Sequence, residues 1–427
     1  MAASPIQTKQ QLQQAVNRTI QATPVSDVHT RLYSEAFGEL SHWGIEELLT
    51  SDALIKELIG FRTDLSSTQW RKLSKREQAD IVWQTLFIDH TPYSEACRGV
   101  LKVFQRLGLD TAARNLSAYR SFFKHLNASD HMDQIFKLAR VTTVCMSNNP
   151  FSPVERIAWE GIDQLDPRFN TALRIDYLVN HWTDACVQLR DWGYEVEEAL
   201  SGKTCREIRS FLKYWIARMN PLYMFSGGFM SGTSNRIIQE CVLPVAAEAG
   251  IPLALFISNE GWQLDDFSSA AGTSLQQADG ISVLAELCAK YPGNKFLCSL
   301  GAGAGVGVHP YLLTAAARQF PNLHLVGYHG SFHIPGALEE LTRLRFELAG
   351  THVTVQHSDS DVLEQLLYKW DDARGVIGKV LYDKYSDLMN TGWRMTEDEI
   401  ARDAAGLLGG DFWKFLGRPN PAVAFKA

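Results

Sequence analysis

The sequence predicts an α/β protein whose parallel strands close into a (β/α)8 barrel. Short apolar, β-branched segments recur along the chain, and longer segments with helical periodicity separate the later ones. Regular strand–helix alternation is typical of a parallel sheet, and eight such strand segments match the number in a (β/α)8 barrel. A doubly wound open sheet is the alternative that the same alternation leaves open.

The predicted strands are bounded by turn residues. They cover residues 25–29, 141–147, 171–176, 221–227, 251–258, 295–301, 322–328 and 351–357. Helical patterns between the later strands cover residues 234–249, 274–291, 309–320 and 335–348. Each of these patterns is long enough for the crossover that joins two parallel strands.

Two intervals between strands are too long to be simple crossovers. Residues 33–138 have a helical pattern and predict a large helical insertion after the first strand, and residues 177–219 predict a smaller one. The tail, residues 361–417, is also helical in pattern. We therefore expect a single barrel domain over residues 1–427, with the large insertion within it and a helical C-terminal segment.

Composition narrows the class of protein. The chain has 427 residues, 45% of them hydrophobic, and a net charge of -7, which is typical of a globular enzyme and argues against nucleic-acid binding. We expect no membrane span, because no window approaches 18 uninterrupted apolar residues. The first 20 residues predict an amphipathic helix and not a signal peptide. Seven scattered cysteines without a CxxC pair favour a reduced, cytoplasmic protein.

Two predicted strands end in polar residues at every second position. The first carries Asp27, His29 and Arg31, and the eighth carries His357, Asp359 and Asp361. Alternate residues of a strand share a face, so each set is expected to point the same way. The first and eighth strands of a closed barrel are neighbours, and active sites lie at the C-terminal ends of barrel strands. Both sets are therefore expected in one polar pocket.

Other strand ends add candidates to this pocket. Arg174 ends the third strand and His329 follows the seventh. Imidazole and carboxylate both suit Zn²⁺ or Mn²⁺, so His29 and Asp359 are the candidate metal ligands. The alternative is that these two side chains hydrogen-bond each other at the barrel mouth. Arg174 has a structural alternative as well, an ion pair with Asp176.

Several segments resemble the uronate isomerase family of the amidohydrolase superfamily. They are "DVHTRLYSEAFGEL", "WGIEELLT", "LRID", "LPVAAEAGIPLALFI", "YPGNKFL", "QHSDSDVLEQLLYKW" and "DFWKFLGR", and the similarity extends over about residues 20–420. The resemblance implies a (β/α)8 barrel that interconverts glucuronate or galacturonate with the corresponding keto-uronate. It also implies a divalent metal, usually zinc, held by an HxH pair on strand one and an Asp on strand eight.

The chain departs from these family motifs at three places. The HxH pair reads His29-Thr30-Arg31, and the family's H-S-D-x-R reads His357-Ser358-Asp359-Ser360-Asp361. Where the family often has T-Y-H-Y, this chain has Thr50-Ser51-Asp52-Ala53. A metal histidine is thus replaced by arginine and an arginine by aspartate. His29, Asp359 and Arg174 match the family.

The paired changes suggest an ion pair between Arg31 and Asp361. Without a partner, a guanidinium ~5 Å from a divalent ion would be repelled by roughly 6 kcal/mol at an effective dielectric constant of about 20, and a carboxylate would offset about half of this. His29 and Asp359 are then the two family ligands left to hold zinc. His329, His333 or a substrate oxygen would have to complete its coordination.

Isomerisation needs a base and an electrophile. We assign these roles to Asp359 and Arg31, with His29 beside them. Arg174 would bind the uronate carboxylate, because a planar guanidinium matches a carboxylate bidentately. His329 and Asp361 are further candidates for substrate contact.

Three functions stay open on the sequence alone. The first is a uronate isomerase. The second is an amidohydrolase-type hydrolase or lyase with a rebuilt site, and the third is a non-catalytic barrel that binds sugar acids. The expected partner is a small sugar acid, without nucleic acid or membrane, and the large insertion and the tail leave a homo-oligomer open.

Overall fold

Seven parallel strands form the central sheet of the computed structural model, which describes residues 5–227, 233–257, 280–301, 310–329 and 334–424. The strands pair in chain order. They are β1 (Val25–Thr30), β2 (Val141–Asn148), β3 (Phe169–Arg174), β4 (Tyr223–Gly227), β5 (Leu253–Ile257), β6 (Phe296–Gly301) and β7 (Leu323–His329). Strands β5, β6 and β7 are buried along their whole length, as expected for a parallel sheet covered on both faces. The order excludes a doubly wound sheet, in which the strand order reverses.

The eighth predicted strand, residues 351–357, lies in the expected place but is not a regular strand. Thr354 forms an isolated parallel bridge with β7. On the other side, the N–H of Arg31, directly after β1, donates to the carbonyl of Ser360, three residues beyond the predicted strand (2.8 Å). Residues 351–361, called the eighth segment below, therefore fill the gap between β7 and β1, and the barrel is nearly closed. Two residues beyond the predicted strand, Asp359 has a left-handed backbone (φ 47°), so the chain does not continue there in extended geometry.

The predicted crossover helices are present between the later strands. They are α13 (Thr233–Ile237), the π-helix Ile238–Val242, α14 (Leu243–Ala249), α15 (Gly280–Lys290), α16 (Pro310–Gln319) and α17 (Pro335–Ala349). The first six residues predicted for the α15 helix lie outside the described residues. Between β2 and β3 lies α9 (Pro153–Gly161), which the sequence analysis did not predict.

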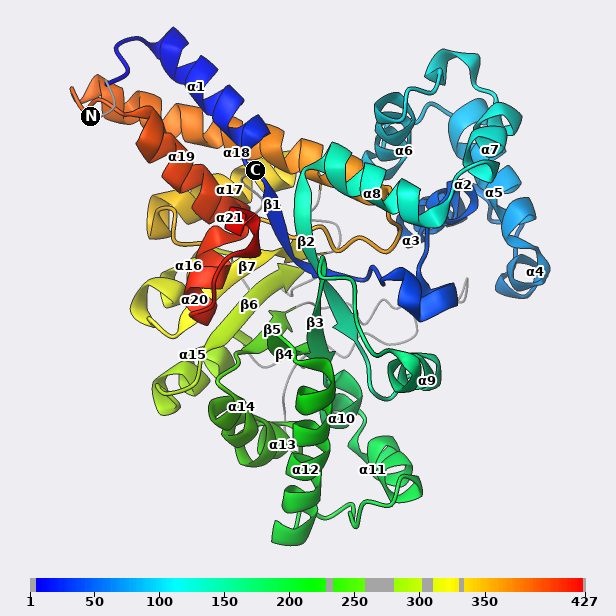
Figure 1. Ribbon diagram of the computed structural model, residues 1–427, viewed down its shortest axis with the longest axis vertical. Helices are drawn as coiled ribbons and strands as arrows, with labels where there is room; N and C mark the ends of the chain where they lie inside the picture. The colour runs from blue at the N-terminus through cyan, green and yellow to red at the C-terminus, as the bar shows by residue number, and fades with distance from the viewer. Residues whose placement is uncertain (1–4, 228–232, 258–279, 302–309, 330–333, 425–427) are drawn as a thin grey trace.

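The long intervals are helical, as predicted. The interval after β1 contains the 3-10 helices Glu35–Leu40 and Thr111–Ala113, the π-helix Gln84–Asp89, α2 (Ile45–Leu49), α3 (Asp52–Phe61), α4 (Ser67–Lys72), α5 (Lys75–Trp83), α6 (Glu95–Arg106), α7 (Leu116–Lys124) and α8 (Ala128–Ala139). The interval after β3 contains α10 (Asp176–Asn180), α11 (Trp182–Asp191) and α12 (Gly202–Met219). In Figure 1, α2 to α7 lie to one side of the barrel, and α10 to α12 lie below it.

Both ends of the chain are helical. The N-terminal helix is α1 (Lys9–Ala22), and the tail contains α18 (Gln365–Asn390), α19 (Glu397–Ala405), the π-helix Gly406–Gly410, α20 (Asp411–Leu416) and α21 (Pro421–Ala424). Helix α18 packs beside α1, α8 and α17 (Figure 1). It begins directly after the segment that carries Asp359, so it anchors the eighth position of the barrel.

Helix α20 closes the barrel interior at the end opposite the strand C-termini. Phe412, Trp413 and Leu416 belong to the same buried apolar cluster as Val28 and Tyr223. The indole of Trp413 donates to Ser26 Oγ at the start of β1 (2.7 Å). The tail therefore fills the end of the barrel opposite the predicted site.

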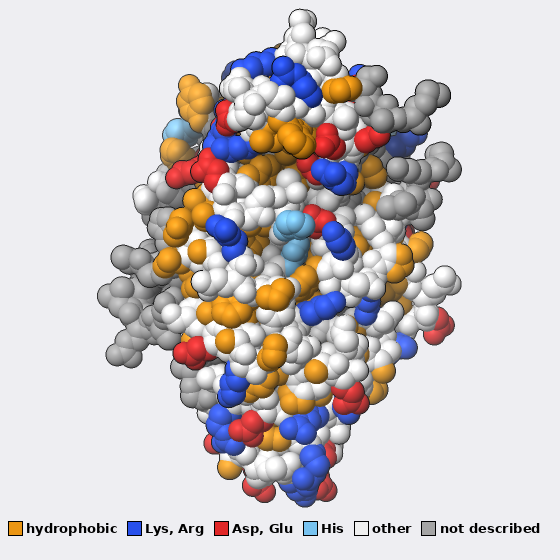
Figure 2. All heavy atoms as spheres, turned by 90° about the vertical axis from the view of Figure 1, so that its left-hand side faces the viewer, with side chains coloured by type: hydrophobic (Ala, Val, Ile, Leu, Met, Phe, Trp, Pro, Cys, Tyr) orange, Lys and Arg blue, Asp and Glu red, His pale blue; other side chains and the backbone are white. Residues whose placement is uncertain are grey.

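The described surface has a mixed character. On the face shown in Figure 2, basic and acidic side chains are interspersed with hydrophobic ones. None of the described helices is both long enough and apolar enough to span a membrane.

Candidate active site

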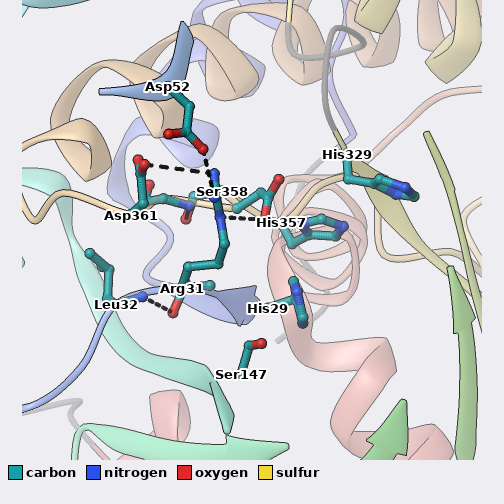
Figure 3. A network of polar contacts seen from close by, with 12 residues as sticks. His29, Arg31, Leu32, Asp52, Ser147, His329, His357, Ser358 and Asp361 are labelled. Atoms are coloured by element: carbon teal, nitrogen blue, oxygen red, sulfur yellow. Dashed lines mark hydrogen bonds and ion pairs between the residues drawn. The ribbon is translucent and has the colours of Figure 1, made fainter. Parts of the chain in front are cut away.

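Arg31, the residue that follows β1, lies among three carboxylates (Figure 3). Its guanidinium nitrogens lie 3.1 Å from Asp52, 3.6 Å from Asp359 and 3.7 Å from Asp361. The suggested ion pair between Arg31 and Asp361 is therefore present. Burial lowers the pKa of Arg31, but the three carboxylates outweigh burial and hold this pKa above its ordinary value. The side chain is a permanent cation.

Asp52 is the member of this cluster to which the sequence analysis gave no role. It is the first residue of α3, in the large insertion, and its carboxylate accepts a hydrogen bond from the guanidinium of Arg31 (3.1 Å). The departure from the family's T-Y-H-Y motif could have indicated it. The three departures thus meet at one point, because β1, the insertion and the eighth segment converge there.

Asp359 is held in place through its backbone. Its N–H donates to the carbonyl of His29 (3.2 Å), and its own carbonyl accepts from the Lys369 ammonium (3.3 Å). Aspartate tolerates the left-handed backbone better than most residues. Burial raises the pKa of its carboxyl, but Arg31, the neighbouring imidazoles of His29 and His357, and Lys369 together outweigh burial and bring this pKa well below the ordinary value. Asp359 is therefore ionised throughout the neutral range.

His29 enters the barrel interior with a defined tautomer. Its Nδ1 lies 2.9 Å from the hydroxyl of Tyr223, and that hydroxyl donates to the carbonyl of Val28 (2.8 Å). The hydroxyl has one proton, so Nδ1 of His29 must be the donor and Nε2 carries the lone pair. Burial lowers the pKa of His29 to about 3, which keeps the imidazole neutral.

Two further imidazoles lie beside His29. The ring of His357 is 5.3 Å from that of His29, and Ser299 Oγ contacts both His329 Nδ1 (3.0 Å) and His357 Nε2 (3.1 Å). Burial lowers the pKa of His329 to about 4. A Cβ at Gly301 would clash with the imidazole of His329, so the glycine is required there. The structure therefore places His329 near the predicted site.

The prediction that Asp27 shares a face with His29 is wrong. Asp27 pairs with Val144 and Thr30 pairs with Met146, so β1 has one more residue than β2 between these pairs. Such a bulge re-aims the side chains that follow it. The Asp27 carboxylate instead accepts from Trp370 Nε1 on α18 (2.8 Å) and from the N–H of Ser358 (3.0 Å). Burial raises its pKa to about 6. Asp27 therefore connects β1 to the Asp359 segment.

Arg174 lies at the end of β3, as predicted. It forms an ion pair with Asp176, the structural role that the sequence analysis gave as the alternative to ligand binding. Its Nε donates to Asp176 Oδ2 (2.8 Å). The side chain is nevertheless 41% exposed, and this ion pair uses one edge of the guanidinium. The contact with Asp176 fixes its direction, while its terminal N–H groups can reach a ligand.

Glu155 on α9 is a buried acid that the sequence analysis did not single out. Its carboxylate accepts from the N–H of Asn149 (2.9 Å) and from the amide of Asn148 (3.3 Å), at the C-terminal end of β2. Burial raises the pKa of Glu155 to about 7 against these hydrogen bonds. No pattern in the sequence distinguishes it from a surface residue of a helix.

We expect Glu155 to make stability depend on pH. Its pKa in the folded chain, about 7, exceeds the ordinary 4.5. The resulting stabilisation is complete below pH 4.5 and is lost as the pH rises to 7, by about 3 kcal/mol. Urea unfolding at pH 5 and pH 8 should therefore show a pH difference that is smaller by about this amount in Glu155→Gln. Equal pH differences in the two proteins would contradict the assignment.

The described residues do not fit a resident divalent metal. Among them, no group of three or more His, Cys, Asp or Glu side chains is placed to hold an ion. His29 and Asp359 offer two donors, and Arg31, which replaces the third, contacts Asp359 at 3.6 Å. Repulsion by Arg31 alone would not exclude a metal, because Asp52 and Asp361 offset the charge of Arg31. His333 lies outside the described residues. Zinc at His29 and Asp359 stays a prediction that this donor set does not support.

Comparisons with known proteins show that the chain is similar to solved structures over nearly its whole length. It is 39% identical to a uronate isomerase from Bacillus halodurans C-125, with 99% of this chain and 100% of the other covered and a TM-score of 0.88. A uronate isomerase from Thermotoga maritima (12% identity, 97% and 98% covered, TM-score 0.71) shares the fold. A glucuronate isomerase from Caulobacter crescentus also shares the fold (12% identity, 98% of this chain and 97% of the other covered, TM-score 0.70). No protein-family model and no curated protein matches the chain.

Proposed function

The chain belongs to the uronate isomerase family, and on this premise we propose that it interconverts an aldo-uronate with its keto-uronate. The candidate substrates are D-glucuronate and D-galacturonate. The supporting observation is the 39% identity to a uronate isomerase over the full length of both chains. His29, Arg174 and Asp359, which match the family motifs, lie at the C-terminal ends of barrel positions one, three and eight.

The reaction moves protons between adjacent carbons. A base removes the proton from C2 of the aldehyde form, the C2 electron pair forms a double bond to C1, and the C1 oxygen becomes negative. The proton on O2 then moves to O1, and the proton that the base removed from C2 is delivered to C1, which leaves a hydroxyl at C1 and the ketone at C2. No atom is gained or lost. The reaction therefore needs a base, an acid and positive charge near the two oxygens.

We assign the proton transfer between carbons to Asp359. It is 19% exposed, so a ligand can reach it, and it is ionised at neutral pH. A carboxylate paired with a guanidinium is a weak base. Its contact with Arg31 is 3.6 Å long, which exceeds a hydrogen bond. A substrate oxygen that accepts from Arg31 would weaken this pair and raise the basicity of Asp359 when the substrate is bound.

His29 and Arg174 complete the assignment. The Nε2 lone pair of neutral His29 can accept a hydrogen bond from a substrate hydroxyl while Tyr223 holds its other nitrogen. Arg174 would bind the uronate carboxylate through its terminal N–H groups. His329 and Asp361 would contact substrate hydroxyls.

The proposal also includes the cellular compartment in which the chain acts. All seven cysteines are free and buried, in keeping with a reducing compartment, and we propose that the chain acts in the cytoplasm. The partner is a small sugar acid.

Turnover by the purified chain tests the function. We expect conversion of D-glucuronate, D-galacturonate or both to the keto-uronate, detected by the loss of the aldehyde. Uronate binding without conversion would instead favour a non-catalytic barrel. Failure of both binding and conversion would favour a hydrolase or lyase with a different substrate.

A further inference from the structure

We propose that Arg31 supplies the fixed positive charge of this active site and that isomerisation by this chain requires no divalent metal. The proposal rests on the isomerase function proposed above and names the cation that the reaction uses. It starts from the disagreement between the donor set at His29 and Asp359 and the metal that the family motifs imply.

The residues around Arg31 neutralise and orient its guanidinium. Carboxylates from three parts of the chain approach it: Asp52 from α3, and Asp359 and Asp361 from the eighth segment. The backbone N–H of Arg31 donates to Ser360 O (2.8 Å), which ties the cation to the same segment. A single surface ion pair would leave a long side chain mobile, whereas three partners restrict its position.

Arg31 can still donate to a ligand. One terminal nitrogen bonds Asp52 (3.1 Å), but Nε and the other terminal nitrogen lie 3.6 and 3.7 Å from the oxygens of Asp359 and Asp361. These two distances exceed a hydrogen bond, so the N–H groups have capacity for a substrate oxygen. The Arg31 side chain is 43% exposed, compared with 19% for Asp359. The guanidinium of Arg31 is thus more accessible than the carboxylate of Asp359.

The position of Arg31 suits the charge that develops in the reaction. The negative charge of the enediolate lies on O1 and O2, next to the carbon from which Asp359 takes the proton. A guanidinium beside Asp359 can donate to one or both oxygens and needs no reorganisation during the reaction. Asp52 and Asp361 hold the guanidinium while Asp359 transfers the proton.

Turnover before and after chelation is the direct test. The purified full-length chain is dialysed against a strong chelator, its zinc is measured by mass spectrometry, and both uronates are assayed. We expect turnover to stay within about twofold at a metal content below about 0.1 per chain, since a fixed cation supplies the electrostatic stabilisation. Loss of turnover on chelation, restored by added zinc, would overturn the proposal and leave the isomerase function intact. No turnover before chelation would overturn both.

Variants of Arg31 test its role separately. Arg31→Gln should lower kcat by roughly 10²–10³-fold, the effect of removing one donor to a developing oxyanion. Arg31→Lys keeps the charge and should retain more activity than Arg31→Gln. The control is Arg18→Gln, which removes an exposed ion pair with Glu397 far along the chain and should leave kcat unchanged. Equal kcat in Arg31→Gln and the unaltered protein would exclude Arg31 as the cation.

Zinc binding gives a readout that is independent of turnover. Titration of the chelated protein with zinc alone should show no site tighter than about 1 μM at the active site, because among the described residues no three His, Cys, Asp or Glu side chains are placed to hold an ion. A submicromolar site that Arg31→Gln leaves intact and His29→Ala abolishes would overturn the proposal.

Discussion

Replacing Asp359 by asparagine is expected to lower kcat for uronate isomerisation by roughly 10²–10⁴-fold, the usual contribution of a general base. Asparagine has nearly the same shape and also tolerates a left-handed backbone, so the φ of 47° at this position can be kept. Arg31 retains Asp52 and Asp361 as partners, so its charge is not left unpaired. KM should change much less than kcat, because the role proposed for the carboxylate is to move the C2 proton.

The control for this substitution is Asp166→Asn. Asp166 is also a partly buried aspartate paired with an arginine, Arg168, but it lies in the turn before β3. Its substitution should leave kcat unchanged and report any general effect of removing an ion pair. If Asp359→Asn keeps more than about a tenth of the unaltered kcat, the proton is transferred by another group, and His29 becomes the next candidate.

Restoring the family residues at two positions is expected to create a zinc site. In Arg31→His with Asp361→Arg, a second imidazole joins His29 and Asp359, and the guanidinium leaves their immediate surroundings. Three protein ligands with an open fourth position are the usual set of a catalytic zinc site. Zinc content after purification with added zinc should rise from below about 0.1 to about 1 per chain. Mass spectrometry of the purified protein measures it.

Arg31→Gln separates the two causes of this change. It removes the cation but adds no ligand, so zinc content should stay low if the number of donors decides. A rise in Arg31→Gln equal to that in the double variant would mean that repulsion by Arg31 is what excludes zinc. Unchanged zinc content in the double variant would contradict the account of the paired charge changes.

Much of the fold could be predicted because it depends on local patterns. The seven strands of the sheet coincide with predicted apolar segments to within about two residues, and their parallel order follows from the helices between them. The helical insertion and tail were predicted for the same reason. The eighth strand was predicted over residues 351–357, but this segment makes only an isolated bridge with β7, because the pairing of an apolar segment depends on its neighbours in the barrel and not on its own pattern.

Part of the site could be predicted from position along the chain. Strand ends indicated His29, Arg31, Arg174, His329, Asp359 and Asp361, because C-terminal strand ends meet at one face of a barrel. Asp27 was misplaced, because a one-residue bulge depends on how β1 pairs with β2. Tyr223, which fixes the tautomer of His29, lies almost 200 residues away in the chain.

The amino-acid sequence by itself determined the strand and helix segments and the identity of the charged residues that replace family ligands. Both are local properties, because periodicity and residue type do not depend on distant contacts. The tertiary structure alone decided that Arg31 meets Asp52 as well as Asp361, that His29 carries its lone pair on Nε2, and that α20 fills the far end of the barrel. These features require segments far apart in the chain to meet, and the packing of the whole barrel determines which of them do.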